Sequence, residues 1–325
     1  MSTASAPGKI ILFGEHAVVY GQPALAVPVN QVQATANVSQ GKRETGEIWI
    51  TARDLRRRYK LSRAGANDPL ALAVRLTLDF LQLPITNNSF TLSVTSTIPR
   101  ASGLGSGAAV CTAIVRALAA HFNASISHAQ VSAIVFETEK LLHGTPSGID
   151  NTVIAYNQPV WFIKGQPPEP FSVAQPFHLL IADTGIASPT KITVGEVRAA
   201  WEKEPKKYNA LFQEIGAVAR TARDIITKVE ADGSRLPALG AAMQLNHELL
   251  ISLGVSSPEL NALVEAARRA GALGAKLSGG GRGGNMLALV TPETSAQVEA
   301  ALKQAGAVRV IHAAIDDRLP TAEPS

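Results

Sequence analysis

The sequence predicts an α+β protein of two domains. Its 325 residues are too many for one compact core and suit two domains packed together. Strand-like and helical segments mix within both halves, which is typical of the α+β class. A polar, proline-rich segment without periodicity, residues 165–177, is the best candidate for a boundary. We therefore expect one domain over residues 1–170 and a second over residues 171–325.

The first half combines strands with two helices. The apolar run Ile10–Phe13 predicts a buried strand, and the apolar–polar alternation of residues 90–99 predicts a half-buried one. Helical composition and period extend over residues 108–122. A second helix is expected over residues 127–142, with Gly144 serving as its C-terminal cap. Looser alternations predict two further strands at residues 31–39 and 46–51.

The second half begins with a strand and continues with a long helical region. The strand is predicted at residues 178–183, and the helical pattern runs from about residue 191 to 271. Glycine and proline interrupt that pattern around Gly233–Pro237 and Gly254–Pro258. The remaining expected elements are strands at residues 275–280, 285–290 and 308–315 and a helix at residues 293–304.

Composition and charge exclude several classes of protein. Hydrophobic residues make up 46% and charged residues 17%, which argues against disorder. The single cysteine, Cys111, excludes an intrachain disulfide and fits a reducing cytoplasm. It falls in an apolar helical pattern, where we expect it to be buried. The apolar run near the N-terminus is too short for a signal core or a membrane span, so we expect a cytoplasmic protein that binds no membrane.

A basic segment, residues 53–60, holds much of the positive charge. It could be a nucleic-acid patch, but neither aromatic interleaving nor a recognised binding motif accompanies it. We favour a solvated loop or helix face and expect no nucleic-acid partner.

A glycine-rich loop joins a predicted strand to a predicted helix in "PRASGLGSGAAV", residues 99–110. Glycines let the backbone approach a ligand, and the free N–H groups of a helix N-terminus favour an anion. The loop is neither a phosphate-binding P-loop with Gly-Lys-Ser/Thr nor a dinucleotide fingerprint. Phosphate binding is the hypothesis, and a turn that only lets strand and helix pack is the alternative.

A second loop, "KLSGGGRGGN" at residues 276–285, has five glycines in six positions. So many glycines cost conformational entropy on folding, which another interaction must offset. Two such loops in one chain favour a polyphosphate ligand. Arg282, within the second loop, adds a charge for phosphate or points into solvent.

Charged residues stand at both ends of the short strand at residues 10–13, with Lys9 before it and Glu15 and His16 after it. Elsewhere, the turn-forming stretch "HGTPSGIDN" at residues 143–151 delivers one carboxylate, Asp150. Asp150 either faces a ligand or caps a short helix that begins at Asn151.

Together these stretches resemble the GHMP small-molecule kinase family. "PRASGLGSGAA" is similar to its ATP loop, P-x-x-x-G-L-G-S-S-A-A, and "KLSGGGRGG" is similar to its third motif, K-L-T-G-A-G-G-G-G. The resemblance implies an N-terminal domain like domain 2 of ribosomal protein S5, a ferredoxin-like C-terminal domain, and an active site in the cleft between them. It implies that ATP binds at Pro99, Ser102, Gly103, Leu104, Gly105, Ser106, Gly107, Ala108, Gly280, Gly281 and Gly283.

The resemblance also assigns chemical roles. Asp150 matches the catalytic base that takes the proton from the substrate hydroxyl, and Lys9 matches the lysine beside it. Glu139 matches the Mg²⁺-binding glutamate, with Ser106 as a second metal ligand, so Mg²⁺ is the expected cofactor and ATP the co-substrate. Substrate is expected at Glu15, His16, Ser147 and Thr190.

"PGKIILFGEHAVVYGQPALA" and "HGTPSGIDN" are most similar to the branch of the family that phosphorylates mevalonate. The expected reaction is ATP-dependent phosphorylation of mevalonate to 5-phosphomevalonate, on the mevalonate route to isoprenoids. Phosphomevalonate, homoserine or a sugar are alternative acceptors, and a non-catalytic ligand sensor or nucleic-acid binder is an alternative of another class. A homodimer is allowed, because the sequence is silent on oligomeric state.

Two positions depart from the family pattern. Gly107 stands where a second serine is usual, which leaves Ser106 or a water to complete the metal shell. Arg282 replaces a glycine of the third motif and should tighten or redirect that loop.

Overall fold

The computed structural model describes residues 1–41, 46–99, 102–144, 146–188, 190–228 and 235–316 of the chain. These residues divide into two compact units. The first contains residues 1–9, 28–99 and 104–157. The second contains residues 10–27 and 100–103 and everything from residue 158 onward, as far as these are described.

The first unit is built on a sheet with the strand order β4–β3–β5–β2, and β1 also pairs with β2. Strand β3 is parallel to β5, with Ile50 opposite Leu92, whereas β2 is antiparallel to β5, with Ala36 opposite Val94. All four side chains are buried. The strands are β1 (Ser2–Phe13), β2 (Ala24–Gln40), β3 (Ile48–Ala52), β4 (Arg57–Lys60) and β5 (Phe90–Ser96).

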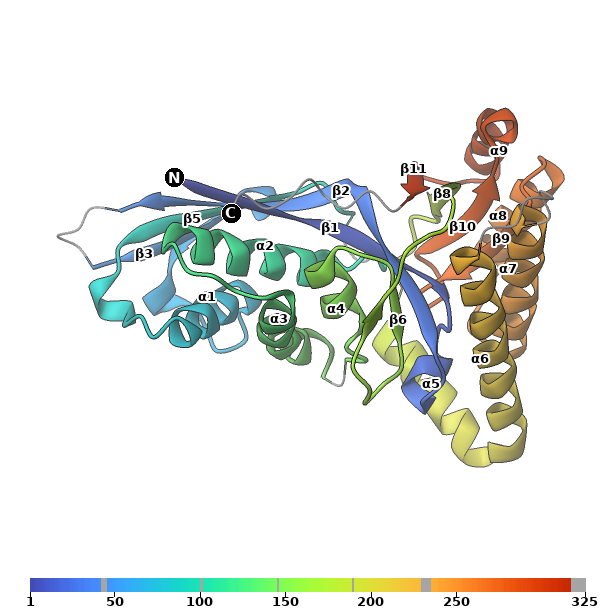
Figure 1. Ribbon diagram of the computed structural model, residues 1–325, viewed down its shortest axis with the longest axis horizontal. Helices are drawn as coiled ribbons and strands as arrows, with labels where there is room; N and C mark the ends of the chain where they lie inside the picture. Colours follow the sequence, from blue (N-terminus) through green and yellow to red (C-terminus); the bar gives the residue numbers. More distant parts are fainter. Residues whose placement is uncertain (42–45, 100–101, 145, 189, 229–234, 317–325) are drawn as a thin grey trace. The chain divides into compact units, whose positions relative to one another are not determined.

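Four helices lie along one face of this sheet (Figure 1). Side-chain caps mark the starts of two of these helices. Asp68 caps α1 through its side chain, which accepts hydrogen bonds from the N–H groups of Leu70 and Ala71 at 3.0 Å. Ser127 and Gln130 form a capping box at the start of α3. The helices are α1 (Pro69–Phe80), α2 (Ser106–His121), α3 (His128–His143) and α4 (Ile149–Tyr156).

The second unit contains an antiparallel four-stranded sheet in the order β11–β8–β10–β9. Strands β8 and β10 are its centre, and residues 285–290 of β10 are all buried. The start of β2 also belongs to this unit and pairs with β6. The strands are β6 (Val160–Phe162), β7 (Glu169–Pro170), β8 (Phe177–Asp183), β9 (Gly274–Ser278), β10 (Asn285–Val290) and β11 (Arg309–Ile315).

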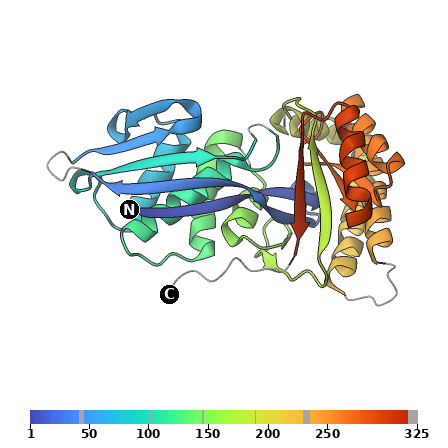
Figure 2. The same ribbon diagram turned by 90° about the horizontal axis from the view of Figure 1, so that it is seen from above.

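Helices of the second unit pack against this sheet. Contacts join α7 and α8 to β9, and α8 and α9 to β10, and Figure 2 shows these helices, coloured orange to red, on one side of the strands. Proline opens α6, α8 and α9 at the first helical position, where its missing N–H has no intrahelical partner to lose. The helices are η1 (Ala17–Tyr20), α5 (Thr190–Lys203), α6 (Pro205–Thr227), α7 (Arg235–Ser252), α8 (Pro258–Arg269) and α9 (Pro292–Gln304).

Most predicted elements are confirmed, and the differences have local causes. The strand expected at residues 10–13 begins already at Ser2, because its polar first half pairs with β2. The helical pattern expected from about residue 191 to 271 corresponds to four helices, α5 to α8. The break between α5 and α6, at Pro205, was not predicted. The break expected around Gly254–Pro258 is confirmed. Of the break expected around Gly233–Pro237, residues 233–234 lie outside the described residues, and Pro237 lies within α7.

The prediction of a loop or helix face for the basic segment at residues 53–60 is confirmed for its first half, the exposed 3-10 helix Arg53–Leu55, and is wrong for its second half. Its second half is β4, the edge strand of the first sheet. The guanidinium of Arg58 lies 4.7 Å from the centre of the Trp49 ring, and the ammonium of Lys60 lies 5.3 Å from the same centre. Cations on an edge strand oppose its pairing with another chain, which gives these charges a structural role.

Cys111 is buried, as expected, and burial raises the pKa of its thiol to about 12. The thiol is therefore unreactive at neutral pH. Among the described helices, none has the length and apolar character that crossing a membrane requires.

Candidate active site

An ion pair between Lys9 of β1 and Asp150 of α4 is the centre of the first group of predicted site residues. The Lys9 ammonium lies 2.8 Å from the Asp150 carboxylate. The Lys9 side chain is 4% exposed, whereas that of Asp150 is 29% exposed. A buried cation thus holds a carboxylate that can still meet a ligand.

The first glycine-rich loop packs directly against Lys9. The Lys9 N–H donates to the carbonyl of Leu104 at 3.0 Å. Gly105 has a φ of 72°, and a Cβ atom there would lie 2.8 Å from Ile154 and 3.1 Å from the Lys9 side chain. Glycine is therefore required at residue 105 both for its backbone conformation and for the close approach of Lys9. The loop and the ion pair form one packed group.

Helix α2 begins at Ser106, within this loop motif and two residues before its predicted start. Gly105 is its N-cap, and no side chain in the described part of the chain caps it. The first N–H groups of a helix have no intrahelical acceptor, and the helix dipole adds positive potential there. Ser106 and Gly107 form the first turn, and Ala108 is buried. This N-terminus has the properties of an anion site.

The bend before Asp150 is made by Gly148, which has a φ of 93° and is the N-cap of α4. The alternative that Asp150 caps a helix starting at Asn151 is wrong, because α4 begins at Ile149 and Asp150 lies within its first turn. A carboxylate is favoured there by the helix dipole. Ser147 is half-buried and accepts a hydrogen bond of 3.4 Å from the N–H of Ile149. Thr145, in the same motif, lies outside the described residues.

The side-chain contacts of Asn151 give a structural reason for an asparagine directly after Asp150. Its side-chain amide donates to the carbonyl and the hydroxyl oxygen of Ser132 on α3, at 3.1 and 2.9 Å. These bonds fix α4 against α3. Since α4 carries Asp150 and α3 carries Glu139, Asn151 fixes the distance between the two carboxylates.

Glu139 is only 3% exposed. The pKa of its carboxyl is raised to about 8, mainly by burial and also by the charge of Asp150, while the charge of Lys9 opposes the rise. Two carboxylates and one lysine therefore share a small region. A divalent cation would relieve the cost of a second negative charge there, and carboxylate oxygens are ligands that Mg²⁺ prefers. The residues present fit a magnesium ion.

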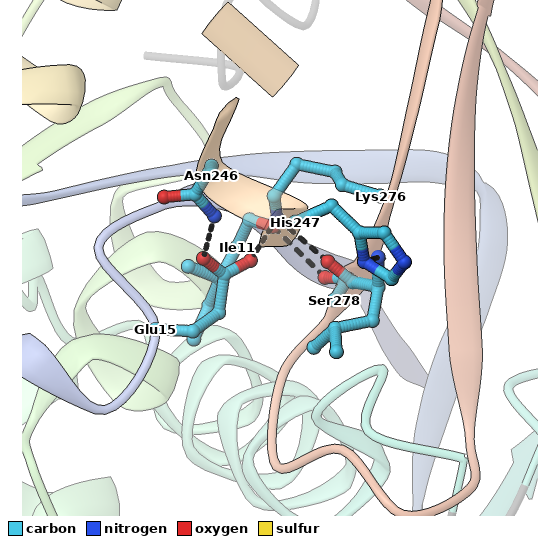
Figure 3. Close-up of polar contacts among 7 residues, drawn as sticks. Ile11, Glu15, Asn246, His247, Lys276 and Ser278 are labelled. Atoms are coloured by element: carbon cyan, nitrogen blue, oxygen red, sulfur yellow. Dashed lines mark hydrogen bonds and ion pairs between the residues drawn. The ribbon is translucent and has the colours of Figure 1, made fainter. Parts of the chain in front are cut away.

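A second group of predicted site residues lies in the second unit and is centred on Glu15. The carboxylate of Glu15 forms an ion pair with Lys276, and neither side chain has any exposed surface. Its other oxygen accepts a hydrogen bond of 3.0 Å from the amide of Asn246 on α7 (Figure 3). The Lys276 ammonium also donates to the carbonyl of Leu277 at 2.7 Å. Both oxygens of Glu15 are thus held by the protein, and its assignment to substrate stays a prediction.

His16 connects the turn after β1 to the second glycine-rich loop. Its Nε2 lies 3.1 Å from the carbonyl oxygen of Gly280, so this nitrogen carries the proton and donates. Burial, more than the nearby charge of Arg282, lowers the pKa of His16 to about 4. The ring is therefore neutral at physiological pH and has Nδ1 left as an acceptor.

The second glycine-rich loop packs closely against its surroundings. A Cβ atom at Gly280 would lie 2.5 Å from the Thr190 hydroxyl, and one at Gly281 would lie 1.9 Å from the carbonyl oxygen of Val255. Ser188 donates from its hydroxyl to the Gly281 carbonyl at 2.9 Å. These contacts offset the entropy that the glycines lose. Together with the hydrogen bond from His16 to Gly280, they bring His16, Thr190 and the loop into one group.

Two family models match the chain. A model of the GHMP kinase N-terminal domain matches residues 70–158, and a model of the GHMP kinase C-terminal domain matches residues 225–308. Two curated relatives, both named mevalonate kinase, come from Thermococcus gammatolerans and Pyrococcus horikoshii. They are 36% and 34% identical to the chain, and each alignment covers 95% of this chain and 94% of the relative.

The chain belongs to the GHMP kinase family.

Solved structures agree with this membership. The mevalonate kinase of L. major, in complex with R-mevalonate, is similar with a TM-score of 0.82 and 26% identity, over 98% of this chain and 97% of that one. The Methanococcus jannaschii mevalonate kinase is similar with a TM-score of 0.81 and 25% identity, over 97% and 98% of the two chains. The fold of this GHMP kinase is therefore the two-domain α+β fold that the sequence predicts.

Some residues of this GHMP kinase were missed by the sequence reasoning. Lys276 stands in the third motif as a lysine within an apolar strand, which was a usable signal. Asn151 follows the catalytic candidate directly. Asn246 carries no signal, because it lies inside a helix whose pattern gives no hint of a buried polar partner.

The buried ion pair can be tested by mutation. Replacing Lys276 with Met leaves the Glu15 carboxylate buried without its cation, which should cost about 3–5 kcal/mol of unfolding free energy. Combining Lys276→Met with Glu15→Gln should cost less than the sum of the two single changes, as measured by chemical denaturation. The control Lys207→Met removes an exposed pair with Glu204 and should cost about 0–1 kcal/mol. Additive costs at Lys276 and Glu15 would show that the two charges do not depend on one another.

The raised pKa of Glu139 predicts a pH dependence of stability. Between about pH 4.5 and 8 the folded protein holds a proton that the unfolded chain releases, so the stability contributed by this group falls as pH rises. Glu139→Gln stays neutral, so its Tm should improve relative to the parent protein between pH 5 and pH 8.5 in the absence of ligands. Glu137→Gln, at an exposed position of the same helix, is the control. A Tm difference that is constant with pH would contradict the raised pKa.

Proposed function

We propose that this GHMP kinase transfers the γ-phosphoryl group of ATP to the hydroxyl of mevalonate, giving 5-phosphomevalonate and ADP, with Mg²⁺ as the metal ion. The observation that carries the proposal is the contact between Lys9 and Asp150 beside the first glycine-rich loop. The acceptor is supported by the relatives, which are named mevalonate kinase, and by the neighbour whose structure contains R-mevalonate.

Asp150 acts as the base. Its carboxylate accepts the proton of the substrate hydroxyl while that oxygen attacks the γ-phosphorus. Lys9 favours the ionised carboxylate and then stabilises the negative charge that grows on the attacking oxygen. The 29% exposure of Asp150, against 4% for Lys9, suits this division of roles.

The glycine-rich loops hold the phosphates. Backbone N–H groups at the start of α2, around Ser106, Gly107 and Ala108, would bind the oxygens of the triphosphate, aided by the dipole of a helix of 16 residues. Phosphoryl transfer depends mainly on positioning and electrostatics, so a rigid anion site contributes directly to rate.

Glu139 and Ser106 are the residues that would hold Mg²⁺. When bound, the ion supplies positive charge that neutralises the phosphate oxygens. Glu139 would lose its proton to bind a cation, since only the carboxylate is a ligand. Gly107 offers no side-chain oxygen, so the hydroxyl ligand of this loop is assigned to Ser106.

The residues proposed to bind mevalonate remain His16, Thr190, Ser147 and Glu15. The neutral ring of His16 suits an alcohol, because its Nδ1 can accept a hydroxyl proton. Phosphomevalonate, the nearest alternative acceptor, would require an available cation. Of the two candidate cations, Arg282 is paired with Glu196 and bonded to the carbonyl of Gly254, whereas Lys191 is exposed beside Thr190. The choice of mevalonate therefore rests on the named relatives. A cytoplasmic location and a homodimer stay predictions.

Removing the base should separate chemistry from binding. Asp150→Asn should lower kcat by about a hundredfold or more, because an amide cannot take the proton. The affinity for ATP, measured by calorimetry, should stay within about twofold, since the loops are unchanged. Asp224→Asn, at an exposed position of α6, is the control and should keep full turnover. Turnover close to the parent rate in Asp150→Asn would reject Asp150 as the base.

An acceptor panel tests the substrate. ADP release should be fast with mevalonate and at least about a hundredfold slower, as kcat/KM, with phosphomevalonate, homoserine and galactose, because the site is matched to one acceptor. The Asp150→Asn variant provides the background for every acceptor. Turnover with phosphomevalonate and none with mevalonate would overturn the proposal, and ATP binding without any turnover would favour a ligand sensor.

A further inference from the structure

Arg282 occupies an unusual backbone position in the second glycine-rich loop. Its φ is 54°, in the left-handed region that residues with a side chain rarely adopt. The matching position of the family motif is glycine, as set out above. An arginine in a conformation that suits glycine requires contacts that hold it there.

Those contacts come from two neighbouring segments. The Arg282 N–H donates to the carbonyl of Val255 at 2.9 Å, and its guanidinium donates to the carbonyl of Gly254 at 3.2 Å. Both acceptors lie between α7 and α8. The guanidinium also forms an ion pair with Glu196 on α5. Arg282 thus joins the loop to α5 and to the α7–α8 turn.

Helix α5 carries Thr190, one of the residues proposed to bind mevalonate. At its start, the Thr190 hydroxyl packs against Gly280, and Ser188 is bonded to Gly281. Glu196 lies six residues further, about 9 Å along the helix axis. The helix is therefore attached to the loop at two separated points, which fixes its direction and not only its first turn.

We propose that Arg282 and Glu196 are positioning residues for mevalonate binding, because their ion pair holds α5 against the second glycine-rich loop. The kinetic part of this inference rests on the proposed function, because it takes Thr190 as an acceptor residue. Neither residue is assigned a contact with the reacting groups. The pair acts through the placement of Thr190.

Glu196 is the cleaner residue to change. The charge of Arg282 also contributes to the lowered pKa of His16, after the larger effect of burial. Replacing Arg282 therefore changes a second site residue, whereas Glu196→Gln removes only the partner of the arginine. Glu265→Gln on α8 is the matched control, since Glu265 forms exposed pairs with Arg269 at 2.7 Å and with Arg268 at 3.9 Å, both within α8.

Steady-state kinetics give the first test. Glu196→Gln and Arg282→Gly should each raise the KM for mevalonate by about twofold to fivefold, with kcat within about twofold, because an exposed ion pair contributes little and acts here on binding. Reversing the pair, Arg282→Glu with Glu196→Arg, should restore part of the loss. The control Glu265→Gln should match the parent protein. A raised KM in Arg282→Gly with an unchanged KM in Glu196→Gln would overturn the proposal, because Arg282 would then act on a ligand directly.

Thermal unfolding separates positioning from general stability. Glycine at position 282 relieves the left-handed strain but adds entropy to the unfolded chain, so the Tm should change little. The KM should rise all the same. A KM increase that appears only together with a clearly lower Tm would mean a structural role and would overturn the proposal.

Hydrogen exchange tests the pair without any substrate. Amide exchange in residues 190–203 should be faster in Glu196→Gln and in Arg282→Gly than in the parent protein or in Glu265→Gln. If the parent protein fails to phosphorylate mevalonate but exchange still rises, the proposed function fails and the link between Arg282 and α5 stands. Exchange that is equal in all four proteins would overturn the link itself.

Discussion

The contact between Lys9 and Asp150 is the interaction on which the chemistry proposed for the first unit depends. It joins β1 to the first turn of α4, two elements separated by more than a hundred residues. Each partner is fixed by other groups: Gly105 packs on the lysine side chain, and Asn151 holds α4 to α3. A carboxylate fixed in this way beside a helix N-terminus is suited to positioning a hydroxyl for attack on a phosphate.

The second unit depends on a different pair, the fully buried ion pair of Glu15 and Lys276. Burying two charges is expensive unless their remaining hydrogen-bonding groups are satisfied, and here Asn246 and a backbone carbonyl satisfy them. The result is a fixed turn that presents His16 to the second glycine-rich loop. Arg282 adds a link from that loop to α5. Both units therefore use ionic contacts to place loops that glycine would leave free.

The sequence predicted the fold class, most of the strands and helices, and the grouping of Lys9, Glu139 and Asp150. The fold class and the elements followed from composition and periodicity, whereas the grouping of the three residues followed from the resemblance to the GHMP kinase family. The edge strand at Arg57–Lys60 was mispredicted, because its pairing with the neighbouring strand β3 overrides a polar local pattern. The roles of Asn151 and Lys276 depend on partners far away in the chain. No local pattern encodes such partners, so only the structure reveals them.

The most direct test of the account is the kcat of Lys9→Met, Asp150→Asn and the double variant, measured with mevalonate and saturating ATP. Methionine keeps the stem that packs against Gly105 and removes only the charge. If the two residues act as one unit, the double variant should be no slower than the slower single variant, within about threefold. Losses that multiply in the double variant would mean that Lys9 and Asp150 act independently, which would contradict the account.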